Sequence, residues 1–312
     1  MIYISSCFRC LEILNDSENE AFGYGLHDRC FIKWFGLETS AQFSSLVRRS
    51  SSKPAEVQAE SEPWKTSFFQ GNFAKYSAYL GGHTYIIKVR EDQAPELPDV
   101  EYISNKIARI LGLPIPDFYL INFFRARAFV SRVFIKPGQT MDLKHIYHYL
   151  PKGQEQYNCE TIINVILEET KRATDAETFV KMCLYDAFIG NNDRHGRNIA
   201  FIVTPKGTAM SPIYDNNSSL GLEHGEILNA QWNPSGRIAT SERSEPGARE
   251  YVREFMRLGY TETVKKFVAS ISMEQCEIAI NQGFCTPLMK TTMIRLLKSR
   301  HEELKDEVAK KT

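Results

Sequence analysis

The chain has 312 residues, of which 43% are hydrophobic, 24% charged and 12% aromatic, as in ordinary globular proteins. Lys and Arg total 38 and Asp and Glu total 38, so the formal charge of +0 disfavours direct nucleic-acid binding and other charge-driven partners. The longest uncharged apolar runs have only the length of a strand, which argues against a transmembrane span. The length is enough for two domains or one large bilobal one.

The seven cysteines are an odd number, and three of them lie within the first 30 residues. The other four fall in segments that look like buried helices, where cysteine behaves as a small apolar residue. This pattern disfavours a disulfide scaffold and suits a reducing compartment. The start of the chain is also a poor secretory signal, because Arg9 interrupts its apolar run and no small-residue cleavage site follows. We therefore expect a cytoplasmic protein, while a secreted or translocated effector remains open.

Four segments follow one another along the chain. Residues 1–38 form a short module that contains cysteine and histidine and ends in an aromatic run. Residues 39–63 are rich in Ser, Glu, Lys and Ala and cannot bury enough apolar surface to stay ordered by themselves, so we interpret them as a linker. Residues 64–135 predict a β-rich lobe, and residues 136–312 predict a helical lobe. We expect residues 63–312 to fold without the module.

The pattern within the two lobes predicts an α+β fold. Aromatic and β-branched runs joined by turns indicate strands in the first lobe, and apolar residues at helical spacing indicate helices elsewhere. The strands are expected over 73–80, 84–89, 118–123 and 128–135. The helices are expected over 100–111, 161–170, 175–189, 246–259, 261–271, 273–281 and 287–310. No repeat of 20 to 50 residues is present, which sets solenoids and propellers aside.

The stretch 190–198 carries the strongest chemical signal. It places Asp193 and Asn198 five positions apart in a polar loop after a helix, and a hairpin that ends in Asp215 follows. Phosphotransfer enzymes of the kinase type assemble their catalytic centre in this order. Asp193 then accepts the proton of a substrate hydroxyl, and Asn198 and Asp215 supply oxygen ligands for Mg²⁺. The alternative is a surface loop with capping Asn and Asp residues.

These motifs resemble those of HipA-type serine/threonine protein kinases, the toxins of bacterial toxin–antitoxin modules. The catalytic loop of that family has the form Gly-Asn-x-Asp-x-His-x-x-Asn and its metal loop reads Pro-x-Tyr-Asp, which residues 190–198 and 212–215 match. The resemblance runs from about residue 69 to the C terminus. It implies a bilobal kinase fold, ATP and Mg²⁺ as cofactors, a protein acceptor, and a small antitoxin as a possible partner.

A kinase also needs a lysine that neutralises the nucleotide phosphates and a glutamate that holds this lysine. Lys88 on a predicted strand and Glu101 in the first turn of the following helix suit these roles. An exposed pair is the alternative. Resemblance to the family's phosphate-covering loop further implies roles for Gly71 and Lys75, although aromatic residues and Gln70 replace the serine that some relatives autophosphorylate.

The N-terminal module contains Cys7-x-x-Cys10 and His27-x-x-Cys30. Two such pairs match the spacing of a structural Zn²⁺ site with three thiolates and one imidazole, and a metal would supply folding free energy that so small a module lacks. Unliganded cysteines with a surface histidine are the alternative.

The prediction is therefore a serine/threonine protein kinase with an N-terminal zinc module. A lipid or small-molecule kinase has the same order of loops, and a catalytically quiet binding protein could share the fold. The identity of the acceptor cannot be derived from these residues.

Overall fold

The computed structural model describes residues 6–14, 23–49, 75–135, 140–150 and 157–310. The chain divides into two compact units, which are not contiguous in sequence. The first comprises Met1–Tyr102 and Pro116–Gln139, and the second comprises Ile103–Ile115 and Thr140–Thr312. Among the described helices, none combines the length and the apolar character that crossing a membrane requires.

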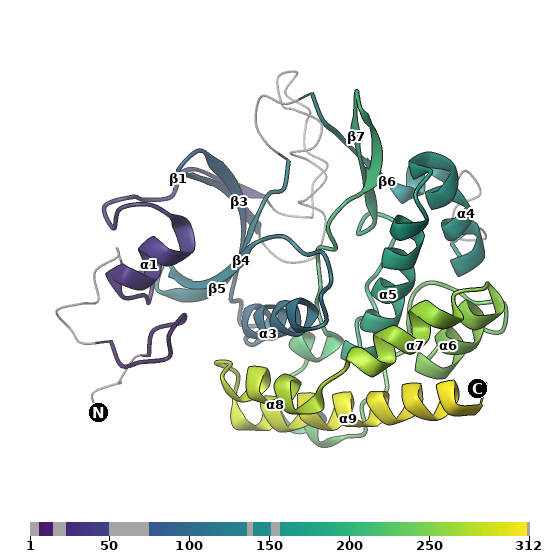
Figure 1. Ribbon diagram of the computed structural model, residues 1–312. Coiled ribbons are helices and arrows are strands. Elements are labelled where there is room, and N and C mark those ends of the chain that lie inside the picture. Colours follow the sequence, from purple (N-terminus) through teal and green to yellow (C-terminus); the bar gives the residue numbers. More distant parts are fainter. Residues whose placement is uncertain (1–5, 15–22, 50–74, 136–139, 151–156, 311–312) are drawn as a thin grey trace. The chain divides into compact units, whose positions relative to one another are not determined.

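The first unit is built on a five-stranded antiparallel sheet (Figure 1). Its strands lie in the order β1-β2-β3-β5-β4 and comprise β1 (Ser44–Arg49), β2 (Lys75–Leu80), β3 (His83–Val89), β4 (Phe118–Phe123) and β5 (Ala126–Arg132). The hairpin β2–β3 turns at Gly81 and Gly82, whose φ angles of 54° and 84° suit glycine. The predicted hairpin and strand pair are thereby confirmed, with small shifts of their ends.

Strand β1 corrects the prediction of a linker over 39–63. Ser44–Arg49 lies inside that stretch and pairs with β2, from Ser44 opposite Tyr79 to Arg49 opposite Lys75. The side chains of Leu46 and Val47 remain 40% and 46% exposed, so backbone hydrogen bonds, more than burial, hold the strand. The composition of this stretch indicates only how much side-chain surface it can bury, and an edge strand held by its backbone leaves no trace there. Residues 50–63 lie outside the described residues.

The N-terminal segment shares the core of this sheet. Helix α1 (Asp28–Phe35) ends at Gly36, and its aromatic side chains pack against strand residues. The ring of Phe35 lies 4.5 Å from that of Tyr119 and 6.0 Å from that of Tyr85, between ring centroids. Phe43 contacts Tyr85 as well, at 5.5 Å. This packing argues against the expectation that residues 63–312 fold unaided, because removing the segment would expose one face of β3 and β4.

Helix α3 (Leu97–Ile110) begins three residues before its predicted start and ends before Gly112, whose φ is 68°. Its first half belongs to the first unit and its second half to the second unit. In the first half, the buried Asp99 lies 3.0 Å from Nε of Arg127 on β5, as an ion pair that ties the helix start to the sheet. This ion pair holds the first turn of the helix against the sheet in which strand β3 carries Lys88.

The second unit is mainly helical, as predicted. Its helices are α4 (Cys159–Thr170), α5 (Ala173–Ile189), α6 (Ala248–Arg257), α7 (Thr261–Ser270), α8 (Met273–Asn281) and α9 (Pro287–Lys310). Helix α5 is buried over most of its length, and the long α9 runs beside α5, α6, α7 and α8 (Figure 1). The predicted ends of α8 and α9 are confirmed. Cysteines 159, 183, 276 and 285 are buried, as expected.

A small antiparallel sheet supports the loop that follows α5. It consists of β6 (Asp142–His145), β7 (Ala200–Thr204) and β8 (Gly207–Met210), in that order. The hairpin β7–β8 is the one expected after residue 198, whereas β6 was not predicted. Strand β6 leads into a 3₁₀-helix, η1 (Ile146–Tyr149), whose Ile146 N–H donates to the Ile199 carbonyl at 2.9 Å. This sheet and η1 therefore brace the C-terminal end of the loop 190–199.

Candidate functional site

The loop with Asp193 begins at Gly190, which ends α5 with a φ of 73°. A Cβ at this position would lie 2.7 Å from Pro234 Cγ, so only glycine fits the turn without a shift of its neighbours. The Asn191 side chain donates to Asp186 at 2.8 Å and accepts from the Asp193 N–H at 3.0 Å. The Asp193 side chain itself is 75% exposed. The backbone is therefore fixed while the carboxylate faces solvent, as acceptance of a substrate proton requires.

A buried guanidinium holds this loop from within. Arg194 is 1% exposed, and its Nε and Nη2 donate to the two carboxylate oxygens of Asp186 at 2.7 and 2.9 Å. Burial alone would lower the pKa of Arg194, but the charge and hydrogen bonds of Asp186 outweigh it and raise this pKa above its usual value. Arg194 therefore stays charged. The Tyr157 hydroxyl donates to the Arg194 carbonyl at 2.6 Å and fixes its backbone as well.

The same guanidinium reaches the segment with Asp215. Arg194 Nη1 donates to the Tyr214 carbonyl at 2.6 Å, and Nη2 donates to Asn216 Oδ1 at 2.8 Å. Asn216 in turn donates to Asn105 Oδ1 on α3 at 3.0 Å, within the second unit. Two segments that are separate in sequence, around Asp193 and around Asp215, are thus brought together by one side chain.

The two predicted Mg²⁺ ligands lie in this framework. Asn198 is buried, and its Nδ2 donates to the Asp193 carbonyl at 2.9 Å, which leaves Oδ1 as the group available to a cation. Asp215 is partly buried and has a φ of 53° in the left-handed region. His195 lies within electrostatic range of both Asp193 and Asp215. Burial lowers the pKa of His195 although both carboxylates act to raise it. Carboxylate and amide oxygens are suitable ligands for Mg²⁺.

A hydrogen-bonded histidine and tyrosine brace the loop from the side of β6. The Tyr214 hydroxyl donates to the Arg197 carbonyl at 2.8 Å, so its oxygen accepts from His145 Nδ1 at 3.2 Å. Burial, together with the neighbouring cationic groups His148, Arg197 and His195, lowers the pKa of His145 to about 4. A neutral ring with its proton on Nδ1 satisfies this geometry. His145 was not predicted, because nothing in the sequence places β6 beside the loop.

In the first unit, Lys88 and Glu101 form a buried ion pair with 2.5 Å between Nζ and Oε1. Their side chains are only 9% and 1% exposed, which excludes the alternative of a solvated pair. Lys75 lies opposite Lys88 in the register of β2 and β3 and is also buried. Two buried lysines therefore lie side by side on adjacent strands, and buried cations of this kind favour anionic groups nearby. Gly71 lies outside the described residues.

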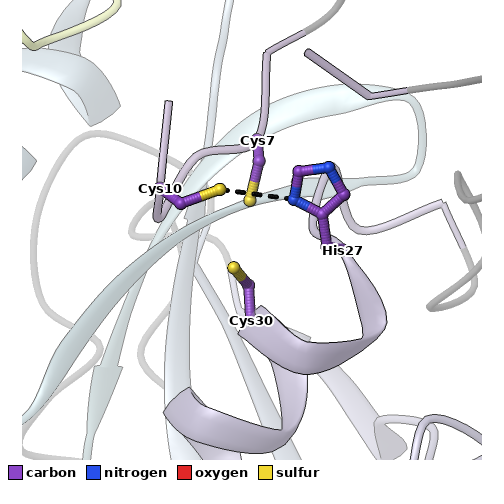
Figure 2. Close-up of side chains that lie close together, drawn as sticks. All are labelled: Cys7, Cys10, His27 and Cys30. Atoms are coloured by element: carbon purple, nitrogen blue, oxygen red, sulfur yellow. Dashed lines mark hydrogen bonds between the residues drawn. The ribbon is translucent and has the colours of Figure 1, made fainter. Parts of the chain in front are cut away.

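The predicted metal ligands converge near the N terminus (Figure 2). One ligand atom from each of Cys7, Cys10, His27 and Cys30 lies within 4.8 Å of the others. A tetrahedral Zn²⁺ with bonds of about 2.3 Å to sulfur needs sulfur atoms about 3.8 Å apart, so the group fits this ion. His27 turns Nδ1 toward Cys10 Sγ at 3.3 Å, and its Nε2 lies 3.1 Å from the Ile13 carbonyl. This carbonyl fixes the tautomer that leaves Nδ1 as the ligand atom.

The thiols lie in different electrostatic surroundings. Burial raises the pKa of Cys30 to about 11. At Cys7, burial also acts to raise the pKa, but hydrogen bonds from the backbone at Cys10, His27 and Arg9 outweigh it and lower the pKa overall. Backbone N–H donors stabilise a thiolate, which is the form of cysteine that binds a metal.

The chain is similar in sequence to known proteins of one family. The family model described as the HipA-like C-terminal domain matches residues 64–280. A putative kinase of Haemophilus influenzae is 30% identical over 152 residues, which are 42% of this chain and 44% of that protein. The serine/threonine-protein kinase toxin HipA of Shewanella oneidensis is 22% identical over 188 residues, 52% of this chain and 43% of the toxin. The matches therefore cover less than half the length of these curated relatives.

Two solved structures share the fold. The proinflammatory kinase CtkA of Helicobacter pylori aligns with a TM-score of 0.64 at 15% identity, over 76% of this chain and 93% of its own. HipA of Shewanella oneidensis, in its complex with HipB and operator DNA, aligns with a TM-score of 0.53 at 14% identity, over 75% of this chain and 61% of its own. The expected kinase-like α+β fold is thereby confirmed.

Proposed function

Since the chain belongs to the family of HipA-like C-terminal domains, as its two motifs indicated, we propose that it is an ATP- and Mg²⁺-dependent kinase that phosphorylates a serine or threonine of a protein. The observation that carries the proposal is the framework around Arg194. It fixes the backbone on either side of an exposed Asp193 and joins it to the segment of Asp215. A capped surface loop has no need of a buried arginine with five hydrogen bonds.

In the proposed reaction the acceptor hydroxyl attacks the γ-phosphorus of ATP, the bond from this phosphorus to the bridging oxygen breaks, and ADP leaves. Asp193 takes the hydroxyl proton. Asn198 and Asp215 would hold Mg²⁺, which neutralises charge on the phosphates. Lys88, held by Glu101, and Lys75 with Gly71 would contact the phosphates. Lys88 contributes to catalysis to the extent that its contact strengthens as negative charge develops.

We also propose that Cys7, Cys10, His27 and Cys30 bind a structural Zn²⁺. Four donors without an open position suit a structural rather than a catalytic ion. The Shewanella HipA structure belongs to a toxin–antitoxin system that includes HipB. This likeness supports a small antitoxin-like protein as a partner of this chain.

The test of the proposed activity uses Asp215→Asn, which keeps the shape of the side chain and removes its charge. Transfer of labelled γ-phosphate to the chain itself or to proteins of a cell extract should fall about 100-fold or more. The exposed Asp142→Asn in β6 is the matched control and should keep wild-type transfer. Transfer only to lipids or small molecules would favour the alternative kinase class. Equal transfer by wild type and Asp215→Asn would refute the assignment.

A further inference from the structure

The loop that carries Asp193 also carries an exposed cation, Arg197, whose backbone is fixed. The Arg197 N–H donates to His195 Nδ1 at 3.2 Å, and the Arg197 carbonyl accepts from the Tyr214 hydroxyl at 2.8 Å. Two backbone turns close this part of the loop, since the N–H groups of His195 and Asn198 donate to the carbonyls of Asp193 and His195, each at 2.8 Å. Arg197 therefore extends from a backbone that is held on both sides.

The ring of His195 lies between Arg197 and the proposed base. Because Nδ1 accepts the Arg197 N–H, the neutral ring has its proton on Nε2, which is 3.9 Å from Oδ1 of Asp193. One imidazole ring thus separates the Arg197 backbone from the Asp193 carboxylate. An acceptor hydroxyl that gives its proton to Asp193 brings its neighbouring residues, spaced by about 3.3–3.6 Å in an extended chain, within reach of Arg197.

An exposed aromatic ring supports the guanidinium of Arg197. The guanidinium carbon lies 5.8 Å from the ring centroid of Tyr147, within the range of a cation–π contact. Tyr147 is 41% exposed, and its N–H donates to the Gly196 carbonyl at 3.4 Å, which joins η1 to the loop. A Cβ at Gly196 would lie 3.1 Å from Cβ of Tyr147, so glycine permits this close approach. The ring restricts the directions that Arg197 can take, which lowers the entropy cost of binding.

The charge of Arg197 is not neutralised by an ion pair. Among the described residues, no carboxylate lies within ion-pair distance of its guanidinium. The exposed Arg257 of α6 shows the usual alternative, because it pairs with Glu160 at 2.6 Å. His148 lies near Arg197 as well, since both act to lower the pKa of the buried His145. The surface beside the loop thus offers a cation whose donors remain available to a ligand.

We propose that Arg197 and Tyr147 select the acceptor by binding an acidic side chain within about three residues of the phosphorylated serine or threonine. This inference rests on the proposed protein kinase activity. A guanidinium binds a carboxylate through two parallel N–H bonds, and such charge-assisted bonds are stronger than neutral ones. Asp193 repels an acidic segment, and a cation beside it offsets this repulsion. Arg197 contacts the acceptor protein, and Tyr147 is a positioning residue.

The test is transfer of labelled γ-phosphate by the full-length chain to a library of serine- and threonine-containing peptides. One flanking position at a time is fixed as Asp, Glu, Lys, Arg or Ala. We expect the wild type to prefer Asp or Glu at one position close to the acceptor. Arg197→Glu should reverse this preference to Lys or Arg, because the substituted side chain attracts cations. Lys206→Glu is the matched control, since Lys206 is exposed in the β7–β8 turn, beyond the far end of β7.

Two peptides that differ only at the selected position, with Asp or Lys there, separate binding from chemistry. Arg197→Ala should raise the KM for the Asp peptide at least about fivefold and change kcat less than about twofold, since this contact lies away from the reacting atoms. Tyr147→Ala should raise the same KM, and Tyr147→Phe should keep it near the wild-type value, because phenylalanine retains the ring face. A rise in the KM for ATP instead would assign Arg197 to the nucleotide and overturn the proposal.

The outcomes separate this proposal from the proposed activity. A wild type that labels neither a peptide nor a protein of a cell extract would refute the protein kinase activity, and the choice of acceptor with it. Labelling of extract proteins but of no peptide would overturn the acceptor proposal alone, because recognition would then not reside in the segment beside the acceptor. Labelling of peptides without a preference for acidic residues, or an unchanged preference in Arg197→Glu, would also overturn it alone.

Discussion

Arg194 links two segments of the candidate site through a side chain that is buried almost completely. A buried ion pair contributes little net stability compared with an apolar pair, but loss of one partner leaves an uncompensated charge. The Arg194–Asp186 pair therefore sets geometry more than stability, since Arg194 also donates to the Tyr214 carbonyl and the Asn216 amide on either side of Asp215.

Replacing Arg194 should therefore affect both the stability of the fold and the turnover of the enzyme. Arg194→Lys keeps a charge but loses the two-pronged bond to Asp186, so we expect a loss of about 2–4 kcal/mol in the free energy of unfolding and a larger loss in turnover than in ATP affinity. Urea denaturation and steady-state kinetics measure both. The exposed neighbour Arg197→Lys is the control and should stay within about 0.5 kcal/mol of the wild type. A change of about 0.5 kcal/mol or less for Arg194→Lys as well would contradict the role of Arg194 in holding the two segments together.

His145 predicts a pH dependence of stability. Burial lowers the pKa of His145 to about 4 in the folded chain, whereas an unfolded histidine titrates near 6.5. The unfolded state therefore binds the extra proton first, and stability falls as the pH decreases from about 6.5 toward 4, by about 3 kcal/mol over the full interval. His145→Asn keeps a donor for Tyr214 but does not titrate. It should lose less stability between pH 7.5 and pH 4.5, measured by urea denaturation with the exposed His224→Asn as reference.

The sequence predicted Asp193, Asn198 and Asp215 because their spacing is local to two short motifs. It could not identify Asp186 as the partner of Arg194, since the two lie on either side of a helix end and their contact depends on how α5 terminates at Gly190. The position of His145 depends on the pairing of β6 with β7, which is a contact between distant segments.

At the scale of elements, the first unit joins an N-terminal helix to a sheet through aromatic contacts. Phe31 is fully buried on α1, where its ring lies 4.9 Å from that of Phe35 and 5.8 Å from that of Tyr24. Its neighbour Ile32 is 49% exposed. The helix therefore has one face that supports β3 and β4 and one face in solvent.

This asymmetry provides a matched pair of substitutions. Phe31→Ala should lower the free energy of unfolding by about 3–5 kcal/mol, because it leaves a cavity beside the rings of Tyr24 and Phe35. Ile32→Ala should change it by about 0.5 kcal/mol or less, since surface substitutions have small effects. Chemical denaturation monitored by tyrosine and tryptophan signals measures both. Similar values for the two variants would mean that α1 is not part of the core.

The ion pair between β3 and α3 predicts coupling between two substitutions. Lys88→Met should lower turnover more than ATP affinity, and Glu101→Gln should do the same more mildly, because Glu101 only positions the lysine. The double variant should be little worse than Lys88→Met alone, since the two residues act as a unit. Kinetics of the four proteins measure the coupling. Additive losses would assign the orientation of Lys88 to another acid.

At the scale of the whole molecule, loss of the proposed Zn²⁺ should affect the first unit and not the second. All four proposed Zn²⁺ ligands belong to the first unit, and Cys30 precedes the buried Phe31 on α1. Removal of the ion with a chelator should therefore speed amide hydrogen exchange in α1, β3 and β4, while the central amides of α5 and α9 stay protected. Mass spectrometry with Cys276→Ser as the control resolves these segments. Equal deprotection of α5 would show that the ion stabilises both units.

Local patterns were sufficient to predict most of the helices and the order of lobes, because hydrophobic periodicity acts within a few residues. They could not predict that residues 103–115 belong with the helical unit while β4 and β5 return to the sheet of the first unit. That division is set by contacts between distant segments. Strand β1 was missed for the same reason, since its order comes from its partner β2.

The left-handed backbone at Asp215 limits which residues can occupy this position at all. Asp, Asn and Gly adopt positive φ at low cost, whereas most other side chains would add strain of about 1 kcal/mol or more. Of the three, only aspartate has a negative charge. Glutamate, the other acidic residue, has the charge but a less favourable backbone preference and a longer reach. Almost no substitution at position 215 would therefore keep both the negative charge and the backbone conformation. Alanine at this position would combine a loss of charge with a change of backbone.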